Sequence, residues 1–554
     1  MRHKLSILLL CYCCGVFAQQ SPPGNAVASA HPLATEAGMD ILQNGGNAFD
    51  AAIAVSATLG VVEPYSSGFG GGGFWLLQRA ADGKQTMIDG REIAPAAAHA
   101  RLYRDANDEV IRGASINGPL AAGIPGMPAA LIHLAEHYGE LPLKKTLAAA
   151  IKHAERGFAV TPRYQKLMRF RQNVIKQYPE TAAIFMQDGE IPQLGYKIVQ
   201  PDLAKTIKAI AKQGRAGFYS GEVARLLVKG CLDGGGNWSR QDLRDYMIIE
   251  RKPLVTNYKG IRIVSAPPPS SGGIALAQTL QILSAFDIDN MTAVQRKHHV
   301  VEAMRRAYRD RAVFLGDPDF VRVPTQRLLD KDYLQGLALT IDSERATPSH
   351  SIGDTPDLQQ TGTDTTHFSV MDSDGNRVAA TLSVNLPFGS GFVAPGTGVV
   401  FNNEMDDFSA KPGASNAYRL VEGAANAIAP GKRPLSSMTP TIIESEQAVG
   451  ILGTPGGSRI ISMVLLGVLD FAAGNAPQSW VSLRRYHHQY LPDVLVYEQH
   501  GMSAHEVSGL QALGHTLREH TRRYGNMQAI MWNKEDNTLQ AASDPRGEGA
   551  ALVK

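Results

Sequence analysis

The sequence predicts an α+β protein whose helices and sheets lie in stacked layers. Three segments have the composition of helices: residues 119–160, 201–231 and 292–314. Strand patterns follow Thr365 and recur at Gly398–Phe401 and Gln528–Trp532. Helical patterns toward both ends of the chain, with strands between them, favour helix packed on sheet. The 554 residues are 44% hydrophobic, enough for a substantial core, and length alone suggests about three domains.

The N-terminal part begins with two adjoining helices. Ala34–Leu42 has helical composition and ends at Asn44-Gly45-Gly46, where a glycine can adopt the left-handed conformation that closes a helix. Asn47 starts a second helix, with Asp50 placed to meet the free amides of its first turn. The small residues of Ala51–Leu59 predict that this helix is closely packed and buried.

A β-hairpin is predicted around Asp374-Gly375. Its first strand begins at Thr365, and its second runs from Val378 to Val384. A two-residue loop would place Thr365 opposite Val384, and a three-residue loop would place it opposite Ser383. In either register Ser383 is a neighbour of Thr365.

The first eighteen residues predict a cleaved export signal. Arg2, His3 and Lys4 precede an apolar run that ends at Phe17 and is followed by Ala18. The alternative is an uncleaved anchor, but the run is short for about 30 Å of hydrocarbon. We therefore expect a periplasmic or secreted protein with no membrane span after signal removal.

The net charge and the cysteine content limit the possible binding partners and disulfide bonds. The formal net charge is +2 and no block of like charges stands out, which argues against nucleic acid as a partner. Signal removal leaves Cys231 alone, so no intramolecular disulfide is expected. Recognition is expected at a local site, and Cys231 is expected to be a buried apolar filler.

Thr365 is the candidate nucleophile. A threonine at a strand start, with a second hydroxyl beside it, suits a nucleophile freed by cleavage between Asp364 and Thr365. Its hydroxyl needs a group that accepts the proton, and the amine of a new N-terminus, with an ordinary pKa of roughly 7.7 to 8.0, would lie in reach. On these grounds alone Thr363 and Thr366 remain alternatives.

Seven sequence blocks follow one another between about Gly24 and Arg546. They are His31-Pro32-Leu33-Ala34-Thr35, Gly45-Gly46-Asn47-Ala48, Gly70-Gly71-Gly72-Gly73-Phe74, Pro267-Pro268-Pro269-Ser270-Ser271-Gly272-Gly273, Asn402-Asn403-Glu404-Met405-Asp406-Asp407-Phe408, Arg433-Pro434-Leu435-Ser436-Ser437-Met438 and Pro455-Gly456-Gly457-Ser458-Arg459. Together they resemble the γ-glutamyltranspeptidases, which are N-terminal-nucleophile hydrolases. The resemblance implies a four-layer αββα sandwich, one continuous fold made from two self-cleaved chains, residues 19–364 and 365–554. It also selects Thr365 among the three threonines.

The resemblance implies catalytic roles for a second hydroxyl and a glycine pair. Ser383 stands where these enzymes commonly have a threonine that supports the nucleophile, and serine keeps the hydroxyl but loses a methyl group that restricts its rotamer. Gly456 and Gly457 match the oxyanion hole, where backbone amides stabilise the negative charge of the tetrahedral intermediate. No cofactor or metal is expected for this chemistry.

The resemblance also implies the residues that bind the substrate. Arg91 matches the arginine that binds the donor's α-carboxylate, and Ser436 and Ser437 match the hydroxyls that assist it. The groups that receive the α-ammonium correspond to Asn385, Glu404 and Asp407. Glu404 departs from the glutamine that is common at its position and should favour a cationic group at least as well. The loop 408–430 resembles the lid over the pocket, with Tyr418 as gate, and a disordered insertion is the alternative.

Three other patterns have simpler explanations. The run Gly68–Gly73 satisfies the dinucleotide fingerprint, but a strand rather than a helix follows it, so we favour tight backbone packing. His487-His488 could suggest a metal site, but neighbouring strand residues face opposite ways and no further ligand cluster is evident. His367 is interpreted as a supporting or packing residue, because an N-terminal threonine carries its own base.

The expected function is that of a self-processing γ-glutamyltranspeptidase/glutathione hydrolase. Its partners would be glutathione and other γ-glutamyl compounds as donors, amino acids or dipeptides as acceptors, and its own two processed chains as a heterodimer. Two rivals are a glutaryl-type acylase on the same fold and an exported binding protein for γ-glutamyl peptides that has lost catalysis.

Overall fold

The computed structural model of the chain describes residues 20–353, 365–411, 416–417, 420 and 423–554. The predicted export segment 1–18, Asp364 and Tyr418 therefore lie outside the described residues. Within the described ranges, no helix has both the length and the apolar character needed to cross a bilayer.

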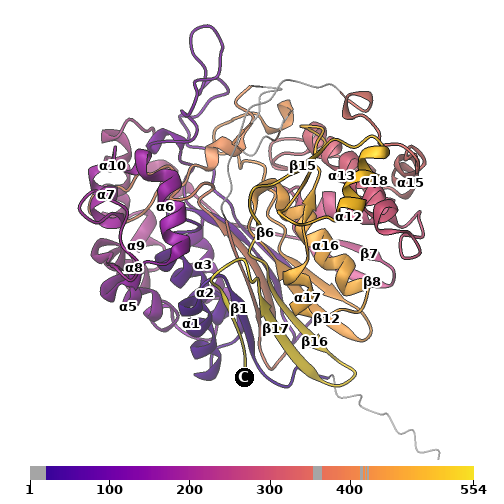
Figure 1. Cartoon of the computed structure of the whole chain (residues 1–554). Coiled ribbons are helices and arrows are strands. Elements are labelled where there is room, and N and C mark those ends of the chain that lie inside the picture. Colours follow the sequence, from indigo (N-terminus) through magenta and orange to yellow (C-terminus); the bar gives the residue numbers. More distant parts are fainter. Residues whose placement is uncertain (1–19, 354–364, 412–415, 418–419, 421–422) are drawn as a thin grey trace, which may run out of the picture.

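Two antiparallel sheets form the centre of the molecule (Figure 1). The seven-stranded sheet has the order β18 (Ala550–Val553), β1 (Ala26–Ser29), β9 (Thr366–Met371), β10 (Arg377–Ser383), β2 (Gly72–Gln78), β3 (Gln85–Gly90) and β6 (Ile249–Arg251). The six-stranded sheet has the order β17 (Thr538–Ser543), β16 (Gln528–Asn533), β12 (Ala448–Gly453), β11 (Thr441–Glu444), β8 (Ile261–Ser265) and β7 (Leu254–Tyr258). Smaller sheets pair β4 (Phe158–Ala159) with β5 (Lys197–Ile198), and β13 (Tyr486–His487) with β14 (Leu495–Tyr497) and β15 (Leu517–Glu519).

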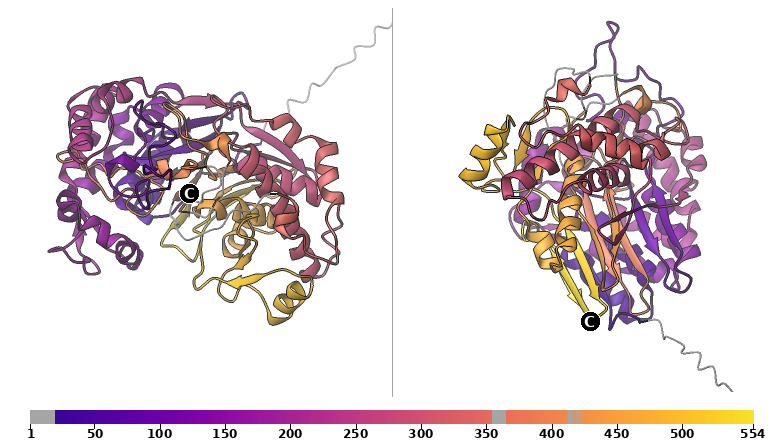
Figure 2. Two further views of the ribbon diagram at one scale, coloured as in Figure 1. Left: turned by 90° about the horizontal axis from the view of Figure 1, so that it is seen from above. Right: turned by 90° about the vertical axis from the view of Figure 1, so that its right-hand side faces the viewer.

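Helices cover the outer face of each sheet, as the view from above shows (Figure 2). On the side of the seven-stranded sheet lie α1 (Pro32–Gln43), α2 (Ala48–Val62), α3 (Met127–His137), α4 (Leu143–Thr146), α5 (Ala148–Arg156), α6 (Pro162–Ile175), α7 (Pro179–Phe185), α8 (Pro201–Gln213), α9 (Ala216–Tyr219), α10 (Glu222–Asp233) and α11 (Arg240–Asp245). On the other side lie α12 (Gly272–Leu283), α13 (Ala293–Phe314), α14 (Thr325–Leu328), α15 (Lys331–Leu339), α16 (Ile460–Ala472), α17 (Pro477–Ser482) and α18 (Ala504–Ala512). The predicted four-layer αββα sandwich is confirmed.

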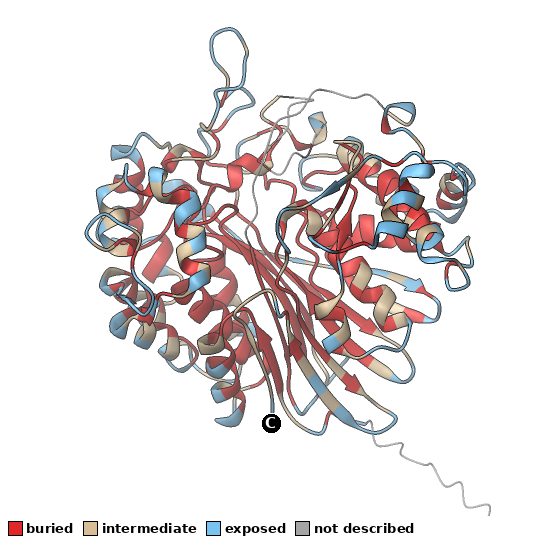
Figure 3. Ribbon diagram, viewed as in Figure 1, coloured by how far each residue is buried: buried red, intermediate tan, exposed pale blue. Residues whose placement is uncertain are grey.

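The alternation of side chains along the strands divides the core in two. In β2, Trp75 and Leu77 pack with the helices of the first layer, whereas Phe74 and Leu76 face the second sheet. Strands buried on both faces read as continuous apolar runs, and Figure 3 shows the central strands buried along most of their length. The sheets are therefore a rigid support for groups at their ends.

The predicted junction between the first two helices is confirmed. Gly45 has φ +84°, the left-handed conformation that follows the end of α1. The Asn47 side chain accepts from the amide of Asp50, and the Asp50 carboxylate accepts from the amide of Asn47, a reciprocal cap for α2. Every residue of α2 is buried, as its small side chains predict.

The predicted helical segments are present, with breaks that the composition did not locate. Residues 292–314 form the single helix α13, whereas residues 119–160 contain a 3₁₀ turn, Pro119–Ala121, and then α3, α4 and α5. The segment 201–231 is divided into α8, α9 and α10, with Gly214 at φ +55° after α8.

The hairpin β9–β10 has the register of a three-residue loop. Met371 pairs with Arg377 and Thr366 with Leu382, which places Thr365 opposite Ser383 at the open end. Gly375 has φ +90° in the turn. The predicted strand at Gly398–Phe401 is wrong: only Val400 forms an isolated bridge, with Val393, because positive φ values at nearby glycines such as Gly398 interrupt the extended chain.

The glycine run before β2 packs backbone against backbone, as expected. A Cβ on Gly70 would lie 2.0 Å from the Val400 carbonyl oxygen, and one on Gly71 would lie 2.1 Å from that of Ser383. The run leads into strand β2 rather than a helix, which removes the structural context of a dinucleotide fingerprint. This close approach fixes the end of β10, where Ser383 lies.

Candidate active site

Residues far apart in the sequence converge on one cavity at the open end of the β9–β10 hairpin. The predicted site residues in its lining are Arg91, Thr365, Ser383, Asn385, Asp407, Ser436, Ser437 and Gly457. Glu404 and Gly456 are not in the lining; Glu404 contacts the lining residue Arg91, and Gly456 immediately precedes the lining residue Gly457 in the chain. The cavity also contains Arg311 and the apolar Leu420, which the sequence did not indicate.

Thr365 lies in the cavity wall, immediately before β9, with only 3% of its surface exposed. The next residue, Thr366, is turned away, and its hydroxyl donates to Oε2 of the buried Glu63 at 2.8 Å. Thr363 lies outside the described residues. This geometry favours Thr365 over Thr366 as the group that meets a substrate.

The end of β10 supplies the hydroxyl opposite Thr365. The Ser383 hydroxyl oxygen accepts from the amide of Asn385 at 2.7 Å, which holds it at the cavity. Asn385 has φ +72°, a left-handed conformation that asparagine tolerates better than most residues, and its Nδ2 donates to the Asn403 carbonyl at 2.8 Å. The turn therefore positions the hydroxyl of Ser383 and the side chain of Asn385 together.

Gly456 and Gly457 form a sharp turn between β12 and α16. Their φ values are +146° and +57°, and Gly457 begins a 3₁₀ turn, Gly457–Arg459, that leads into α16. Backbone amides at the start of a helix point outward and are attracted to negative charge. The turn can therefore present amides to an oxyanion beside Thr365.

Arg91 and Asp407 line the cavity and belong, with Glu92 and Glu404, to a cluster that we call the carboxylate wall. Arg91 is 1% exposed, and its Nη1 lies 2.7 Å from Glu404 Oε2 and 3.6 Å from Glu92 Oε2. Its Nη2 lies 2.5 Å from Asp407 Oδ2, and its Nε donates to the Pro434 carbonyl. Sequence reasoning missed Glu92, although it is adjacent to Arg91.

The carboxylate wall holds one guanidinium against three carboxyl groups. Burial raises the pKa of Glu404 to about 7, because the nearby Asp407 adds to the effect and Arg91 only partly opposes it. Burial and Glu404 together raise the pKa of Glu92 well above its usual range. Burial opposes the charge of Arg91, but attraction by Glu404, Asp407 and Glu92 outweighs it and raises the Arg91 pKa. A further cation beside the wall would favour the ionised forms of Glu92 and Glu404.

Arg311, Ser436 and Ser437 also line the cavity and belong, with Ser271, to a second cluster that we call the hydroxyl wall. The Ser271 amide and hydroxyl both donate to the Ser436 carbonyl, at 2.8 and 2.7 Å. Arg311 Nε donates to the Ser271 hydroxyl at 3.0 Å, and an Nη donates to the Ser437 hydroxyl at 3.5 Å. Ser271, in the segment Pro267–Gly273, therefore helps to fix the serine pair through its hydrogen bonds to the Ser436 carbonyl.

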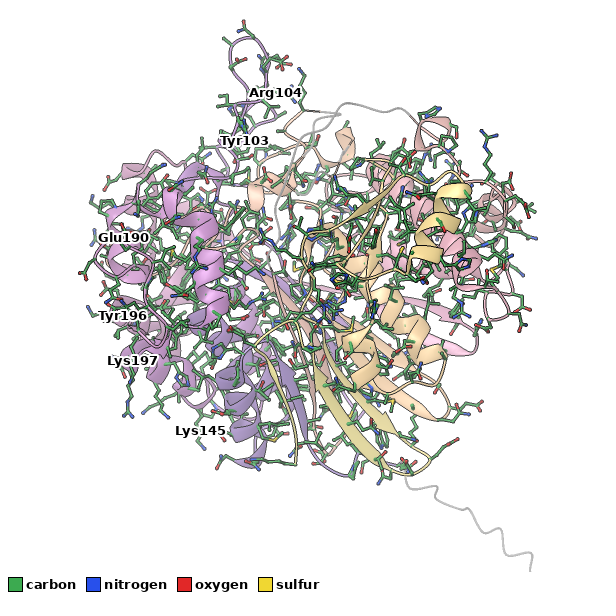
Figure 4. The ribbon with its side chains drawn as sticks, in the orientation of Figure 1. Tyr103, Arg104, Lys145, Glu190, Tyr196 and Lys197 are labelled. Atoms are coloured by element: carbon green, nitrogen blue, oxygen red, sulfur yellow. The ribbon has the colours of Figure 1, made fainter. Side chains whose placement is uncertain are left out.

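The described part of the loop 408–430 lies against the cavity. Leu420 lines it, and the Ala417 amide donates to the Asp406 carboxylate, which also accepts from Ser115. Burial raises the pKa of Asp406 to about 6, although both hydrogen bonds oppose the shift. Figure 4 shows Arg104 in the projecting segment above the sandwich, where it donates to the Ala410 carbonyl. These contacts support a covering role, while Tyr418 lies outside the described residues.

The histidines highlighted by the sequence have packing roles. His367 is fully buried between the Thr381 and Ser369 hydroxyls, and burial lowers its pKa to about 3. His487 contacts Ser462 and Gln489, and His488 contacts Asp493.

A second histidine cluster, which sequence reasoning missed, joins His298 and His515 near Glu302. Arg305 and Arg306 already bind the Glu302 carboxylate, at 3.1 and 2.7 Å. Along α13, Glu302 lies about two and a half turns and His298 about three and a half turns before Arg311, and neither they nor His515 line the cavity.

Comparisons with known proteins identify the family of the chain. The family profile described as Gamma-glutamyltranspeptidase matches residues 34–554. The Glutathione hydrolase proenzyme of Escherichia coli (strain K12) is 41% identical over 534 residues, which cover 94% of this chain and 90% of that protein. Cephalosporin acylase from Bacillus halodurans superposes with a TM-score of 0.83 at 28% identity, covering 96% of each chain. Helicobacter pylori gamma-glutamyltranspeptidase gives 0.57 at 38% identity, covering 58% of this chain and 92% of that one. The chain belongs to the γ-glutamyltranspeptidase family.

Proposed function

We propose that the protein is a self-processing γ-glutamyltransferase and glutathione hydrolase that uses Thr365 as its nucleophile. The observation that carries the proposal is that Thr365 lines the same cavity as Arg91, Asp407, Ser436 and Ser437. A donor with a free α-ammonium and a free α-carboxylate has complementary charged and hydroxyl partners among these groups.

Processing begins with the bond between Asp364 and Thr365. The Thr365 hydroxyl oxygen attacks the Asp364 carbonyl carbon, the C–N bond breaks, and the nitrogen leaves as an amine that carries the hydroxyl's proton. Water then cleaves the resulting ester and restores the hydroxyl. Two chains result, residues 19–364 and 365–554, which remain together as a heterodimer because β9 and β10 lie inside a sheet formed by both.

The mature reaction repeats this chemistry on a donor. The new amine accepts the proton of the Thr365 hydroxyl as the oxygen attacks the γ-carbonyl carbon, and then gives it to the departing nitrogen. The amides of Gly456 and Gly457 stabilise the oxyanion, and Ser383 supports the nucleophile. Water, or the amine of an amino acid or dipeptide, resolves the γ-glutamyl ester.

Donor recognition uses residues of both walls. Asp407 and Asn385 bind the α-ammonium, with Glu404, which contacts Arg91, adding negative charge. Arg91, Ser436 and Ser437 bind the α-carboxylate. Leu420 of the loop 408–430 lines the cavity, which supports a lid role for this loop.

The alternative function on the same fold is that of a glutaryl-type acylase. The structural similarity to a cephalosporin acylase is the reason to consider it. A glutaryl group lacks the α-ammonium, so it would leave the three carboxyl groups around Arg91 without a further cation. We therefore favour the γ-glutamyl donor. We further propose that the segment 1–18 exports the protein, so that it acts in the periplasm or outside the cell.

The test is purification followed by a denaturing gel, N-terminal sequencing of the smaller chain and assay of glutamate release from glutathione. Two chains, the smaller beginning at Thr365, with glutamate release would support the proposal. A single uncut chain that binds glutathione without cleaving it would favour the binding-protein rival. Cleavage of glutaryl amides in preference to γ-glutamyl amides would favour the acylase.

A further inference from the structure

A second cavity, of about 540 Å³, lies among α13, α16, α18 and the segment between α17 and β13. These three helices lie on the right of Figure 1, where α13 packs against α18. No described residue lines both this cavity and the one that contains Thr365. Helix α16 has Ile460 in the Thr365 cavity and Leu469 in the second one, about 14 Å further along its axis. The second cavity is therefore a separate site, and its volume falls in the range of small-molecule pockets, about 300–1,000 Å³.

The inner part of the second cavity is apolar. Val300 of α13 lines it together with Leu466 and Leu469 of α16 and Leu483, which follows α17. Val300 is fully buried, whereas the three leucines are half-buried. An apolar group that covers these side chains leaves water and removes the leucines from water, and both changes favour binding.

The basic residues of the lining differ in how their charges are compensated. Lys297 Nζ lies 2.5 Å from Glu506 Oε1, so these two charges offset each other. Arg296 instead donates to the carbonyls of Ile288 and Asp289, and Arg484 donates to the carbonyl of His500. Backbone carbonyls orient a guanidinium without cancelling its charge. Among the described residues, no carboxylate forms an ion pair with Arg296 or Arg484.

Asp470 is the other acid in the lining. Its Oδ1 accepts from Asn475 Nδ2 at 2.8 Å, and its Oδ2 is buried. Three cations and two acids leave the lining with one positive charge in excess. Arg296 and Arg484 are exposed, so this excess charge lies where water and a ligand can reach it.

We propose that the second cavity binds a small amphipathic carboxylate, a molecule with one apolar chain and a single carboxylate. The chain packs on Val300, Leu466 and Leu469, and the carboxylate lies beside the guanidiniums of Arg296 and Arg484, which offer paired N–H donors. Charge complementarity selects this ligand, because an apolar cation is repelled by the excess positive charge and a neutral molecule gains nothing from it. The inference does not depend on the proposed catalytic function.

The test is isothermal titration calorimetry of the whole purified protein at pH 8 with three probes. Octanoate has both the chain and the charge, octanamide lacks the charge, and acetate lacks the chain. We expect one saturable site for octanoate, about 10-fold weaker binding of octanamide, and no saturable binding of acetate. Saturating L-glutamate, the ligand expected in the Thr365 cavity, should leave the octanoate Kd unchanged.

Variants of the lining locate the site. Arg296→Met and Arg484→Met should each raise the octanoate Kd about 5- to 10-fold and change the octanamide Kd less than about 2-fold. Ala473→Trp, at an exposed position of the lining, places a ring in the cavity without disturbing a buried side chain, and it should abolish binding of both probes. Arg522→Met, which changes an exposed arginine outside the lining, is the matched control and should bind octanoate like the wild type.

Several results would overturn the inference. They are the absence of saturable octanoate binding, equal affinities for octanoate and octanamide, competition by L-glutamate, and octanoate binding that survives Ala473→Trp. A second copy of the chain is the alternative occupant of the cavity. If analytical ultracentrifugation shows a wild-type dimer that Ala473→Trp converts to a monomer, this face is a subunit interface and the inference fails.

Discussion

The two walls of the cavity stabilise their buried arginines through different kinds of contact. The carboxylate wall consists of ionic contacts between side chains, with Arg91 joined to Glu404 at 2.7 Å and to Asp407 at 2.5 Å. In the hydroxyl wall the acceptors are neutral, with Ser271 hydrogen-bonded to the Ser436 carbonyl and the Arg311 guanidinium to hydroxyls rather than to carboxylates. Ionic clusters depend strongly on every member, whereas neutral hydrogen bonds can be removed singly at lower cost. The first wall should therefore be sensitive to pH and to truncation, and the second less so.

The proposed nucleophile, Thr365, should show the largest effect. Thr365→Ala removes the attacking oxygen, so we expect a single uncut chain and a loss of glutamate release on the order of 10³-fold or more. A denaturing gel and a glutathione assay measure both results. Thr366→Ala is the matched control, since its hydroxyl contacts Glu63 rather than the cavity, and it should still be processed. If Thr365→Ala matured and stayed active while Thr366→Ala did not, the nucleophile would have been assigned to the wrong threonine.

Breaking the carboxylate wall should have the next largest effect. Arg91→Met leaves Glu92, Glu404 and Asp407 buried without their shared cation, and removal of one partner from a buried ion pair costs about 3–5 kcal/mol. Denaturant unfolding should show this loss of stability, and activity should fall steeply. Arg79→Met, which breaks an exposed pair with Asp82, should change little. Similar stabilities for the two variants would contradict the ionic description of this wall.

The hydroxyl wall should tolerate change better. Ser437→Ala removes one neutral donor to the substrate carboxylate, so we expect KM for γ-glutamyl-p-nitroanilide to rise about 10-fold with stability nearly unchanged. The exposed Ser508→Ala is the control. A loss of stability as large as that of Arg91→Met would remove the distinction between the two walls.

The smallest predicted effect is a pH dependence specific to the carboxylate wall. Burial raises the pKa of Glu404 to about 7, so its carboxyl gains negative charge as pH rises from 6 to 8. The inhibition constant of L-glutamate should therefore fall several-fold over this range, whereas that of glutarate, which lacks the ammonium, should not fall.

In Glu404→Gln, the inhibition constant of L-glutamate should no longer fall between pH 6 and 8, so its pH dependence should resemble that of glutarate. The same raised pKa means that Glu404 contributes stability below its ordinary pKa of 4.5 and loses that contribution as pH rises through about 7. Relative to the wild type, the glutamine variant should therefore become more stable above pH 7. A glutamate inhibition profile identical in both proteins would show that Glu404 does not influence the ammonium subsite.

Much of the fold could be predicted because its signals are local. The Asn47 cap, the glycine end of α1 and the alternating hairpin depend on residues a few positions apart. The error at Gly398–Phe401 has the same origin: short apolar runs resemble strands, but the glycine conformations there depend on packing against residues such as Gly70. The choice between two hairpin registers also needed the structure.

Site residues that belong to short sequence motifs could be predicted from the sequence. Site residues that reach the cavity only through the packing of distant segments could not. Thr365, Ser383 and the glycine pair lie in distinctive blocks, and all but Gly456 reach the cavity lining. Arg311 belongs to a helix rich in arginines, whose pattern resembles a solvated face, yet Arg305, Arg306 and Arg311 are each 2% exposed. Only the packing of α13 between distant segments shows that one of them lies in the cavity.

The most direct test of the account is mass spectrometry of fully active enzyme after brief exposure to a γ-glutamyl donor and acid quenching. The account predicts two polypeptides, with the smaller one beginning at Thr365 and carrying a γ-glutamyl group on that residue. Active material that retains an intact bond between residues 364 and 365, or that carries the acyl group on another residue, would contradict it.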